Sequence, residues 1–596
     1  MAVPFIPNDA QRKLIKNFYS WVEYDLSLQK TTFELLNRRT IKTFWGDSLR
    51  DYAVISIEHD PQDWVKPYTS AIARDKANTF IANLAGQQIL PAVVAQNERQ
   101  QIDKAISRAL TAGCRWSFDN DGYPSSSGGR KFVDKVTKMV TTGTVHVLKN
   151  FVDGRPVSEV IPNEEMLIPN YWQTDIQKQS RLGRLVNNVT YEEAELMFGH
   201  LPNWNFVQMG GDNRLWFDES EEVLKEYSAV PLPEKGRVQI IHYWWPVKGG
   251  KRQKHFNTVV NGIPMFVPEN ESPYRHGWFP VVKEVFEMLP DFYWGNSLPN
   301  KVSEDKKFRD AWKTLIRAKG KIALLPPLLA PEGMVLDENI VMPGQITSVP
   351  GDTGAILQVP GVSKEVSQND VAILELTDKE IDQGTSAPIL SGLSEGGRVT
   401  KGQILLQQSN AQRLLGLFGL MMKFLIEAEG RLDVQNLLQF IPKTKWKKLV
   451  VPDVLLFDGV KGEMEIIFEP VATEEKELFD ESIRLMEMEL SSRAQGKAIE
   501  IVKIDPAYAR TLDLYVTVVG NPAMNLSPEL QQDMVLERAK LYMELGMNPQ
   551  AVQRMVVRAF GDSENELIMQ NPVTPESPSK PKPPSPIALR SLQAAV

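Results

Sequence analysis

Cysteine and histidine are scarce in this sequence of 596 residues, and long apolar runs are missing. The single cysteine, Cys114, excludes an intramolecular disulfide and any cysteine-based zinc site. The six histidines show no HxxxH or HExxH spacing, so we expect them to be packing or surface residues. The most apolar stretch, Leu414 to Ile426, contains Lys423 and is far shorter than the roughly twenty residues of a membrane span. It predicts a buried helix and no membrane span.

The motifs of common enzymes are also missing. A phosphate-binding loop needs GxxxxGK followed by Ser or Thr, but in the Gly-rich stretch from Gly392 to Gly402 the last paired glycine is followed by Arg398 and Val399. There is no GxSxG elbow, and carboxylate pairs such as Glu164 and Glu165 are common on solvated turns. We therefore predict no enzyme activity, no cofactor and no metal, and favour a structural or interaction role.

The charge balance bears on nucleic acid. A net charge of −8 and a pI of about 5.6 argue against a protein that coats nucleic acid through a broad basic surface. They do not exclude a surface past which DNA moves, where strong phosphate contacts would act as a brake. The first residues, MAVPFIPNDAQRK, lack an apolar run behind basic residues, so no secretory signal is expected.

The first half of the chain reads as helical and then β-rich. Apolar spacing predicts helices over residues 10–45, 68–90 and 98–112. Residues 131–150 run from helix into strand, with Gly143 as the break. From Phe151 to Pro290, turn signals and β-rich runs predict a meander with a helical insertion near Tyr191 to Met197.

The second half opens with an ordered series of five segments. A charged helix with a basic balance, Ser297 to Lys319, precedes a Pro- and Gly-rich stretch, Lys321 to Val362, that allows only short strands and turns. An acidic helix, Lys364 to Gln383, is followed by a Gly-rich loop, Pro388 to Gly402. A long apolar helix, Gln403 to Glu429, completes the series.

The opposite charges of the two rod-like helices leave three arrangements open. The rods pair within one subunit, pair between neighbouring subunits, or remain two independently solvated faces. Each exposed ion pair would contribute only about 0–1 kcal/mol, so charge alone does not decide. The aromatic clusters at Tyr243 to Trp245 and Tyr293 to Trp294 could stack on bases, but core or interface positions explain them better.

The rest of the chain returns to strands and turns at residues 433–470. Helices are then predicted at residues 473–494, 527–545 and 549–560. The Pro-rich segment 571–586 predicts a disordered tail.

The middle of the chain resembles the portal proteins of tailed double-stranded DNA bacteriophages, the head–tail connectors, and its length and layout are like those of short-tailed phages. Phe292 to Leu298 (FYWGNSL) looks like the start of the family's first stem helix, Lys321 to Val362 like the clip, and Glu365 to Gln383 like the second stem helix. Pro388 to Gly397 looks like the tunnel loop, and the RVT sequence that begins at Arg398 looks like the start of the long wing helix. These motifs cover about a quarter of the chain.

Weaker similarity extends to Val133 to Leu148 and to Val160 to Pro169 (VIPNEEMLIP). The resemblance implies an α+β subunit with a wing, a two-helix stem, a small β clip and a helical C-terminal crown. The implied divisions are a wing region 1–290, first stem helix 291–320, clip 321–362, second stem helix 363–385, tunnel loop 386–400, long wing helix and β return 401–470, crown 471–570 and Pro-rich tail 571–596.

The resemblance also implies a function and its residues. The chain would form a homo-oligomeric ring, a dodecamer, at one capsid vertex of the virion after assembly in the host cytoplasm. It would conduct double-stranded DNA non-specifically during packaging and ejection, and contact terminase, tail adaptor proteins and the major capsid or scaffolding protein. The implied tunnel-loop residues are Leu390, Ser391, Gly392, Leu393, Ser394, Glu395, Gly396, Gly397, Arg398 and Lys401. The implied partner-docking residues of the clip are Pro326, Pro327, Pro331, Pro343, Gly344, Pro350 and Gly351.

Two functions of other classes stay open from the sequence. One is a scaffold or adaptor without a channel that binds partners through the Pro-rich tail. The other is a hydrolase whose site is formed by dispersed residues. Rings with a central hole in electron micrographs would separate a DNA conduit from both.

Overall fold

The computed structural model describes most of the first 441 residues and scattered strands beyond them. The described residues are 8–55, 66–85, 90–95, 101–122, 126–152, 154–207, 234, 236–246, 254–266, 274–324, 328–331, 346–349, 357–358, 367–384, 401–441, 448–455, 461–468, 483, 485–487, 490, 499–504, 509, 514–519, 536, 539–540, 542–543 and 552.

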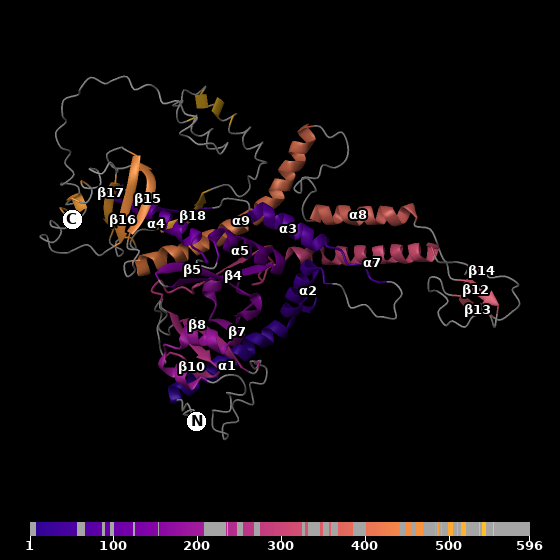
Figure 1. The fold of residues 1–596 in the computed structure, drawn as a ribbon, viewed down its shortest axis with the longest axis horizontal. Coiled ribbons are helices and arrows are strands. Elements are labelled where there is room, and N and C mark those ends of the chain that lie inside the picture. The colour runs from indigo at the N-terminus through magenta and orange to yellow at the C-terminus, as the bar shows by residue number, and fades with distance from the viewer. Residues whose placement is uncertain are drawn as a thin grey trace. The chain divides into compact units, whose positions relative to one another are not determined.

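The chain divides into two compact units, which Figure 1 shows together with the element labels. Unit 1 comprises Met1–Lys447 and Tyr508–Gly520, and unit 2 comprises Lys448–Ala507 and Asn521–Val596. The fold class is mixed α+β, as predicted: helices up to 40 residues long accompany small, mostly antiparallel sheets.

The N-terminal helical region is broken where one helix was expected. Helix α1, Asp9–Lys30, begins with a capping box at Asn8, and α2 covers Ile41–Ala53. Between them strands β1 (Thr32–Phe33) and β2 (Arg39–Thr40) pair antiparallel across the 3₁₀ turn η1 (Glu34–Leu36). The prediction of a helix over 10–45 is wrong here because Asn37 and Arg38 adopt φ angles of 54° and 59°, which reverse the chain.

The next predicted helices are present with shifted boundaries. They are α3 (Ile72–Ala85), α4 (Gln101–Asp119) and α5 (Gly128–Thr142). Leu90, expected at a helix end, instead starts strand β3 (Leu90–Ala95), which pairs with β18 (Leu514–Val519). The predicted break at Gly143 is confirmed, since this glycine ends α5 at a φ of 81°.

The predicted β-rich region forms two sheets with a helical insertion. A three-stranded antiparallel sheet has the order β11-β4-β5, and a five-stranded one has the order β10-β9-β8-β7-β6. Their strands are β4 (Thr144–Val152), β5 (Arg155–Ile161), β6 (Met166–Leu167), β7 (Leu182–Thr190), β8 (Arg237–Pro246), β9 (Lys254–Val260), β10 (Ile263–Pro264) and β11 (Val281–Val285). The inserted helix α6 covers Tyr191–Phe198 and starts with a capping box at Thr190.

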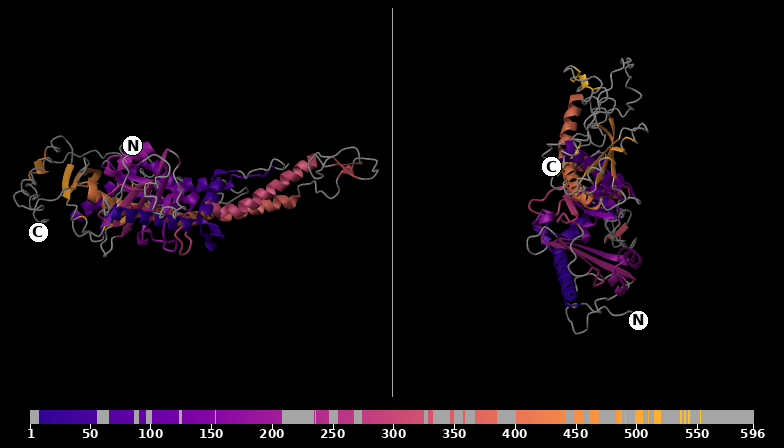
Figure 2. Two further views of the ribbon diagram at one scale, coloured as in Figure 1. Left: turned by 90° about the horizontal axis from the view of Figure 1, so that it is seen from below. Right: turned by 90° about the vertical axis from the view of Figure 1, so that its left-hand side faces the viewer.

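The five-segment series has the predicted order of helix, strands and helix. Helix α7 covers Leu298–Leu324, α8 covers Gln368–Gly384 and α9 covers Lys401–Phe440. Strands β12 (Leu328–Pro331), β13 (Ile346–Val349) and β14 (Leu357–Gln358) form a small sheet between α7 and α8 in sequence. Figures 1 and 2 show α7 and α8 side by side.

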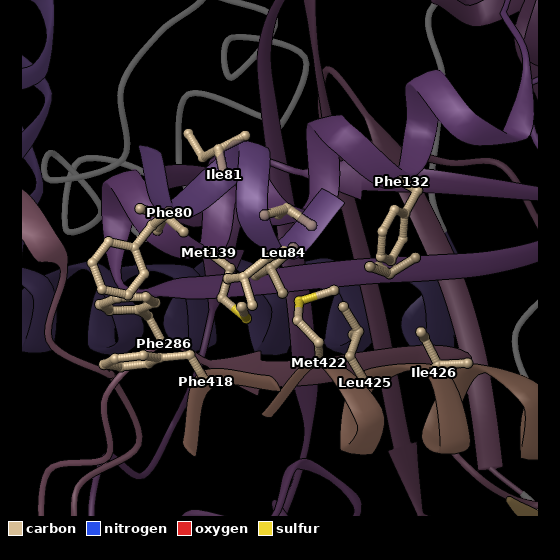
Figure 3. Close-up of a cluster of buried hydrophobic side chains, with 14 of the residues drawn as sticks. Phe80, Ile81, Leu84, Phe132, Met139, Phe286, Phe418, Met422, Leu425 and Ile426 are labelled. Atoms are coloured by element: carbon tan, nitrogen blue, oxygen red, sulfur yellow. The ribbon is translucent and has the colours of Figure 1, made fainter. Parts of the chain in front are cut away.

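The largest apolar cluster joins α9 to α3, α5 and the sheet that contains β4 and β11. Figure 3 shows Phe418, Met422 and Leu425 of α9 facing Phe80 and Met139. The rings of Phe418 and Phe286 stack with centroids 4.2 Å apart. Leu417, Leu420 and Phe424 on the same helix are exposed. The stretch predicted as a buried helix is therefore buried along one face only.

Unit 2 contains a three-stranded sheet of β15 (Lys448–Leu455), β16 (Lys461–Phe468) and β17 (Ile499–Ile504). β15 and β16 are antiparallel, whereas β16 and β17 are parallel. Across the described portions of both units, none of the helices is long and apolar enough to cross a membrane. The predicted crown helices and the Pro-rich tail fall mostly or wholly outside the described residues.

Candidate functional site

The segment before α7 is fixed by two glycine backbones that approach each other closely. A Cβ atom on Gly143 would lie 2.3 Å from the carbonyl oxygen of Gly295, and one on Gly295 would lie 2.4 Å from the carbonyl oxygen of Gly143. The Gly295 N–H donates to Thr144 Oγ1 at 2.9 Å. Only glycine fits at these two positions, which explains the glycine in the FYWGNSL sequence.

The aromatic residues of the same sequence form part of a core. Tyr293 and Trp294 are fully buried, and Trp294 packs edge-on against Trp45 with ring centroids 4.6 Å apart. The Tyr293 hydroxyl lies 3.0 Å from Nε2 of the buried His146. Burial lowers the pKa of His146 to about 3, so this imidazole is neutral. The prediction that these aromatics are core residues is confirmed, as it is for Tyr243.

The base of α7 is tied to the helices around it. Ser297 Oγ accepts the Asn300 N–H at 3.2 Å and lies 2.6 Å from Ser48 Oγ on α2. Further along the helix, Lys306 Nζ donates to Asp51 Oδ1 at 2.8 Å, and one turn beyond it Asp310 Oδ2 accepts the Ser70 N–H at 3.1 Å. These contacts hold the start of a helix of about 40 Å to the folded body of unit 1.

Helices α7 and α8 form an antiparallel pair held by opposite charges. Arg309 pairs with Asp378, and further along Lys319 Nζ lies 2.9 Å from Asp370 Oδ2. Trp312 Nε1 also donates to the Asp370 carbonyl oxygen at 3.1 Å. Of the three arrangements left open by the sequence, pairing within one subunit is confirmed for these residues. Pairing between neighbouring subunits stays a prediction.

Asp370 has a second role at the start of α8. Its Oδ2 accepts the Ser367 N–H at 2.9 Å, and its own N–H donates to Ser367 Oγ at 3.3 Å, which together form a capping box. The hydrogen bond from Lys319 and that from the Ser367 backbone hold the pKa of Asp370 below its ordinary value. Asp370 therefore stays ionised and joins the start of α8 to the last turns of α7.

Large apolar side chains remain exposed on both helices. On α7, Phe308 and Leu315 are 52% and 53% exposed. On α8, Val371 and Leu376 are 47% and 59% exposed. The pair thus carries apolar groups on surfaces that its own ion pairs do not cover.

Few of the residues that the resemblance implies lie within the described parts of the chain. Pro331 is the last residue of β12 and pairs with Val349 in parallel register. The other implied clip residues, Pro326, Pro327, Pro343, Gly344, Pro350 and Gly351, lie outside the described residues. So do the implied tunnel-loop residues 390–398, whereas Lys401 is the first residue of α9.

A buried cluster of five charged side chains fixes the far part of α9. Lys135 of α5 donates to Glu429 Oε2 at 2.8 Å and to Asp121 Oδ2 at 2.9 Å. Lys149 of β4 lies 3.0 Å from Glu429 Oε2 and 3.0 Å from Asp433 Oδ2. All five side chains are at most 9% exposed. Two ammonium groups thus face three carboxylates inside the protein.

The ionisation of this cluster follows from burial and its lysines. Burial alone would raise the pKa of Glu429, but the ammonium groups of Lys135 and Lys149 outweigh it and hold that pKa below its ordinary value. Burial raises the pKa of Asp433 despite the nearby Lys149. For Lys149, burial favours the neutral form, yet the surrounding carboxylates raise its pKa. These ion pairs join α9 to α5 and to β4, so a shift in the register of α9 would leave buried charges unpaired.

The sequence did not reveal the buried cluster. Its members come from the turn after α4, from α5, from β4 and from α9, which are separated by up to several hundred residues. Each is an ordinary charged residue in its local pattern. The available signal is the position of Lys135 and Lys149, which fall among apolar residues and not on the polar face of their helix or strand.

Comparisons with known proteins found similarity among solved structures. No protein-family model matches the sequence, and no curated protein matches it. Among solved structures, a chain in "Neck of empty GTA particle computed with C6 symmetry" is similar, with 11% sequence identity over 60% of this chain and 77% of that chain, at a TM-score of 0.28. A TM-score this low establishes neither a shared fold nor a shared function.

Proposed function

We propose that this chain is the subunit of a portal protein, the head–tail connector of a short-tailed double-stranded DNA phage. The observation that carries the proposal is the unit formed by α7, the strands β12–β14 and α8. Two antiparallel charged helices leave the folded body, and a small Pro-containing sheet lies between them in sequence. This order is that of stem, clip and stem in the family that the sequence resembles.

In this proposal the subunits form a dodecameric ring through the helix pair. The exposed Phe308 and Leu315 on α7 would pack on the exposed Val371 and Leu376 of α8 in the next subunit. Burying such side chains contributes about 1.5–3 kcal/mol each, far more than the exposed ion pairs around them. The basic balance of α7 and the acidic balance of α8 favour this head-to-tail pairing over pairing of like helices.

The ring would conduct double-stranded DNA and perform no chemistry itself. Carboxylates on the bore, such as the exposed Glu375 and Glu380 of α8, would repel phosphates and prevent sticking. Arg398 and Lys401 would make short-lived phosphate contacts at the tunnel loop. Terminase would supply ATP hydrolysis and would dock on the β12–β14 sheet. The tail adaptors would later dock on the same sheet.

Electron microscopy of the purified full-length chain tests the ring. We expect end-on views with a central hole, and a loss of rings in a Phe308→Glu, Leu376→Glu variant that still folds by circular dichroism. Leu196→Glu is the control, because Leu196 is 85% exposed but lies on α6. A monodisperse monomer at all concentrations, or rings that survive in the double variant, would contradict the proposal.

The channel role has its own test. Replacing both Arg398 and Lys401 by alanine should alter DNA retention or packaging in particles. Packaging and retention that match the wild type would remove these two residues from the channel role and leave the ring itself untouched.

A further inference from the structure

A groove of about 530 Å³ runs beside β11, away from the helix pair. All five residues of β11 line it, together with residues of the 3₁₀ turn η3 (Ile176–Lys178) and of α9. Its rim carries two exposed apolar side chains, Trp278 and Met288, which are 40% and 65% exposed. Exposed Trp and Met side chains next to a groove are typical of protein-binding surfaces.

β11 is an edge strand of its sheet, and one side of its backbone faces this groove. Phe286 N–H donates to Gly143 O at 2.9 Å, and Pro280 O accepts from Lys149 N–H at 2.8 Å, so the even-numbered residues of β11 face β4. In an antiparallel pair, the backbone groups of alternate residues point away from the partner strand. The N–H and C=O groups of Lys283 and the N–H of Val285 therefore point toward the open side.

The edge is closed at both ends by other parts of the chain. At one end the Gln177 side chain accepts the Phe279 N–H at 2.8 Å and donates to Phe279 O at 3.1 Å. At the other end the Asn296 N–H donates to Glu287 O at 2.9 Å. The open part is therefore the short stretch from Lys283 to Val285, which suits a short extended segment and not a long strand of a second sheet.

The Glu284 carboxylate fills the backbone hydrogen-bonding position on the open side of β11. Its Oε1 accepts the Val285 N–H at 3.0 Å, where a carbonyl oxygen of an added strand would otherwise lie. Within the described part of the chain, no basic side chain lies within ion-pair distance of this carboxylate. Burial raises the pKa of Glu284 to about 7, which shows how poorly the site solvates a lone negative charge.

The neighbouring cation is already engaged on the opposite face of the strand. Lys283 Nζ donates to Thr174 O at 3.0 Å and lies 4.3 Å from the ring centroid of Tyr293. Successive side chains of a strand point to opposite faces, and Lys283 makes no ion pair with Glu284. The Lys283 charge lowers the pKa of Glu284, but burial outweighs this effect. Arg431 on α9 lines the groove as an exposed side chain and does not pair with Glu284 at salt-bridge distance.

We propose that this groove binds a short extended segment of another protein that adds to β11 between Lys283 and Val285 and places a lysine or arginine on Glu284. Apolar residues of the segment would contact Trp278 and Met288. The incoming cation draws the Glu284 carboxylate away from its own backbone, and the Val285 N–H then donates to a carbonyl oxygen of the segment. Main-chain bonds give affinity, and the basic side chain gives specificity. The inference is independent of ring formation and of DNA conduction.

A peptide selection tests the proposal. A displayed library of random nine-residue peptides is selected against the purified full-length chain, and the enriched sequence is made with a fluorescein label for anisotropy titration. We expect enriched peptides with apolar residues at alternate positions around one lysine or arginine. Binding of the synthetic peptide should weaken at least tenfold with Glu284→Gln and with Trp278→Ala, and should be unchanged with Glu164→Gln, an exposed carboxylate on another part of the chain.

Three results would overturn the proposal. They are no enrichment, enriched peptides without a basic residue, and equal affinity for the wild type and the Glu284→Gln chain. If the glutamine variant does not fold, the same peptide with glutamate in place of its basic residue must fail to bind the wild type. A change in the chain's own oligomeric state on Glu284→Arg, without peptide binding, would assign the groove to a second copy and also overturn it.

Discussion

Replacing Lys149 by methionine should destabilise unit 1 strongly because it removes one of two cations from a buried cluster. The Lys149 ammonium lies 3.0 Å from Glu429 and from Asp433, and 2.8 Å from Ser158 Oγ. Methionine keeps most of the side-chain volume, so the change removes charge and hydrogen bonds more than packing. Three carboxylates would then face Lys135 alone.

The expected magnitude follows from the burial of these groups. Removing one partner of a buried ion pair typically costs about 3–5 kcal/mol, because the remaining charge stays desolvated without compensation. Adding Asp433→Asn to Lys149→Met removes one of the stranded carboxylates. The second change should therefore restore about 2 kcal/mol, although it would be destabilising alone.

Hydrogen exchange with mass spectrometry measures this locally, which matters because the chain has two units that need not unfold together. We expect faster exchange in β4 and in the second half of α9, with a lower denaturation midpoint. The control is Lys423→Met, which breaks only a partly exposed pair with Glu427 at 3.7 Å on the same helix and should change stability by less than about 1 kcal/mol. Equal effects of Lys149→Met and Lys423→Met would refute the reasoning.

Three further predictions concern other contacts. Gly143→Ala should cost about 2–4 kcal/mol from its positive φ and from the clash with the Gly295 carbonyl, whereas Gly129→Ala, with open space at Cβ, should not destabilise; thermal melts compare them. Arg309→Met should speed hydrogen exchange in α8, with a loss of about 1 kcal/mol, whereas Lys307→Met, whose partner lies on α7 itself, should leave α8 unchanged. The pKa of His146 is about 3 in the folded state and near 6.5 in the unfolded state, so its contribution to stability is present above pH 6.5 and is lost as the pH falls toward 3. Between pH 7 and pH 5, the free energy of unfolding should therefore fall by about 2 kcal/mol less in His146→Gln than in the wild type. An unchanged pH profile of stability in the variant would contradict this.

Local patterns predicted much of the fold. Gly143 was read as a helix end, and the structure places it there because its positive φ suits glycine. The order of charged helix, short strands and acidic helix follows from periodicity and from Pro and Gly content. The helix over 10–45 was the main error, since only the left-handed conformation of Asn37 and Arg38 reverses the chain there.

The contacts between distant residues could not be predicted in the same way. The opposite charges of α7 and α8 are compatible with three arrangements. The ion pair of Lys319 with Asp370 shows that these two helices pair within the chain. Most residues of the implied tunnel loop and of the implied clip lie outside the described parts, so their roles rest on the resemblance. The groove beside β11 had no sequence signal at all, because it depends on which strand lies at a sheet edge.

The sequence by itself determined the order of the elements, the buried aromatics before α7 and the charge balance of the two rods, because these depend on residues close together in the chain. Only the tertiary structure decided that Gly295 meets Gly143, that Lys149 meets Asp433, and that Glu284 makes no ion pair with another described residue. Such pairings join residues far apart in sequence, and their energies depend on burial, which no local pattern specifies.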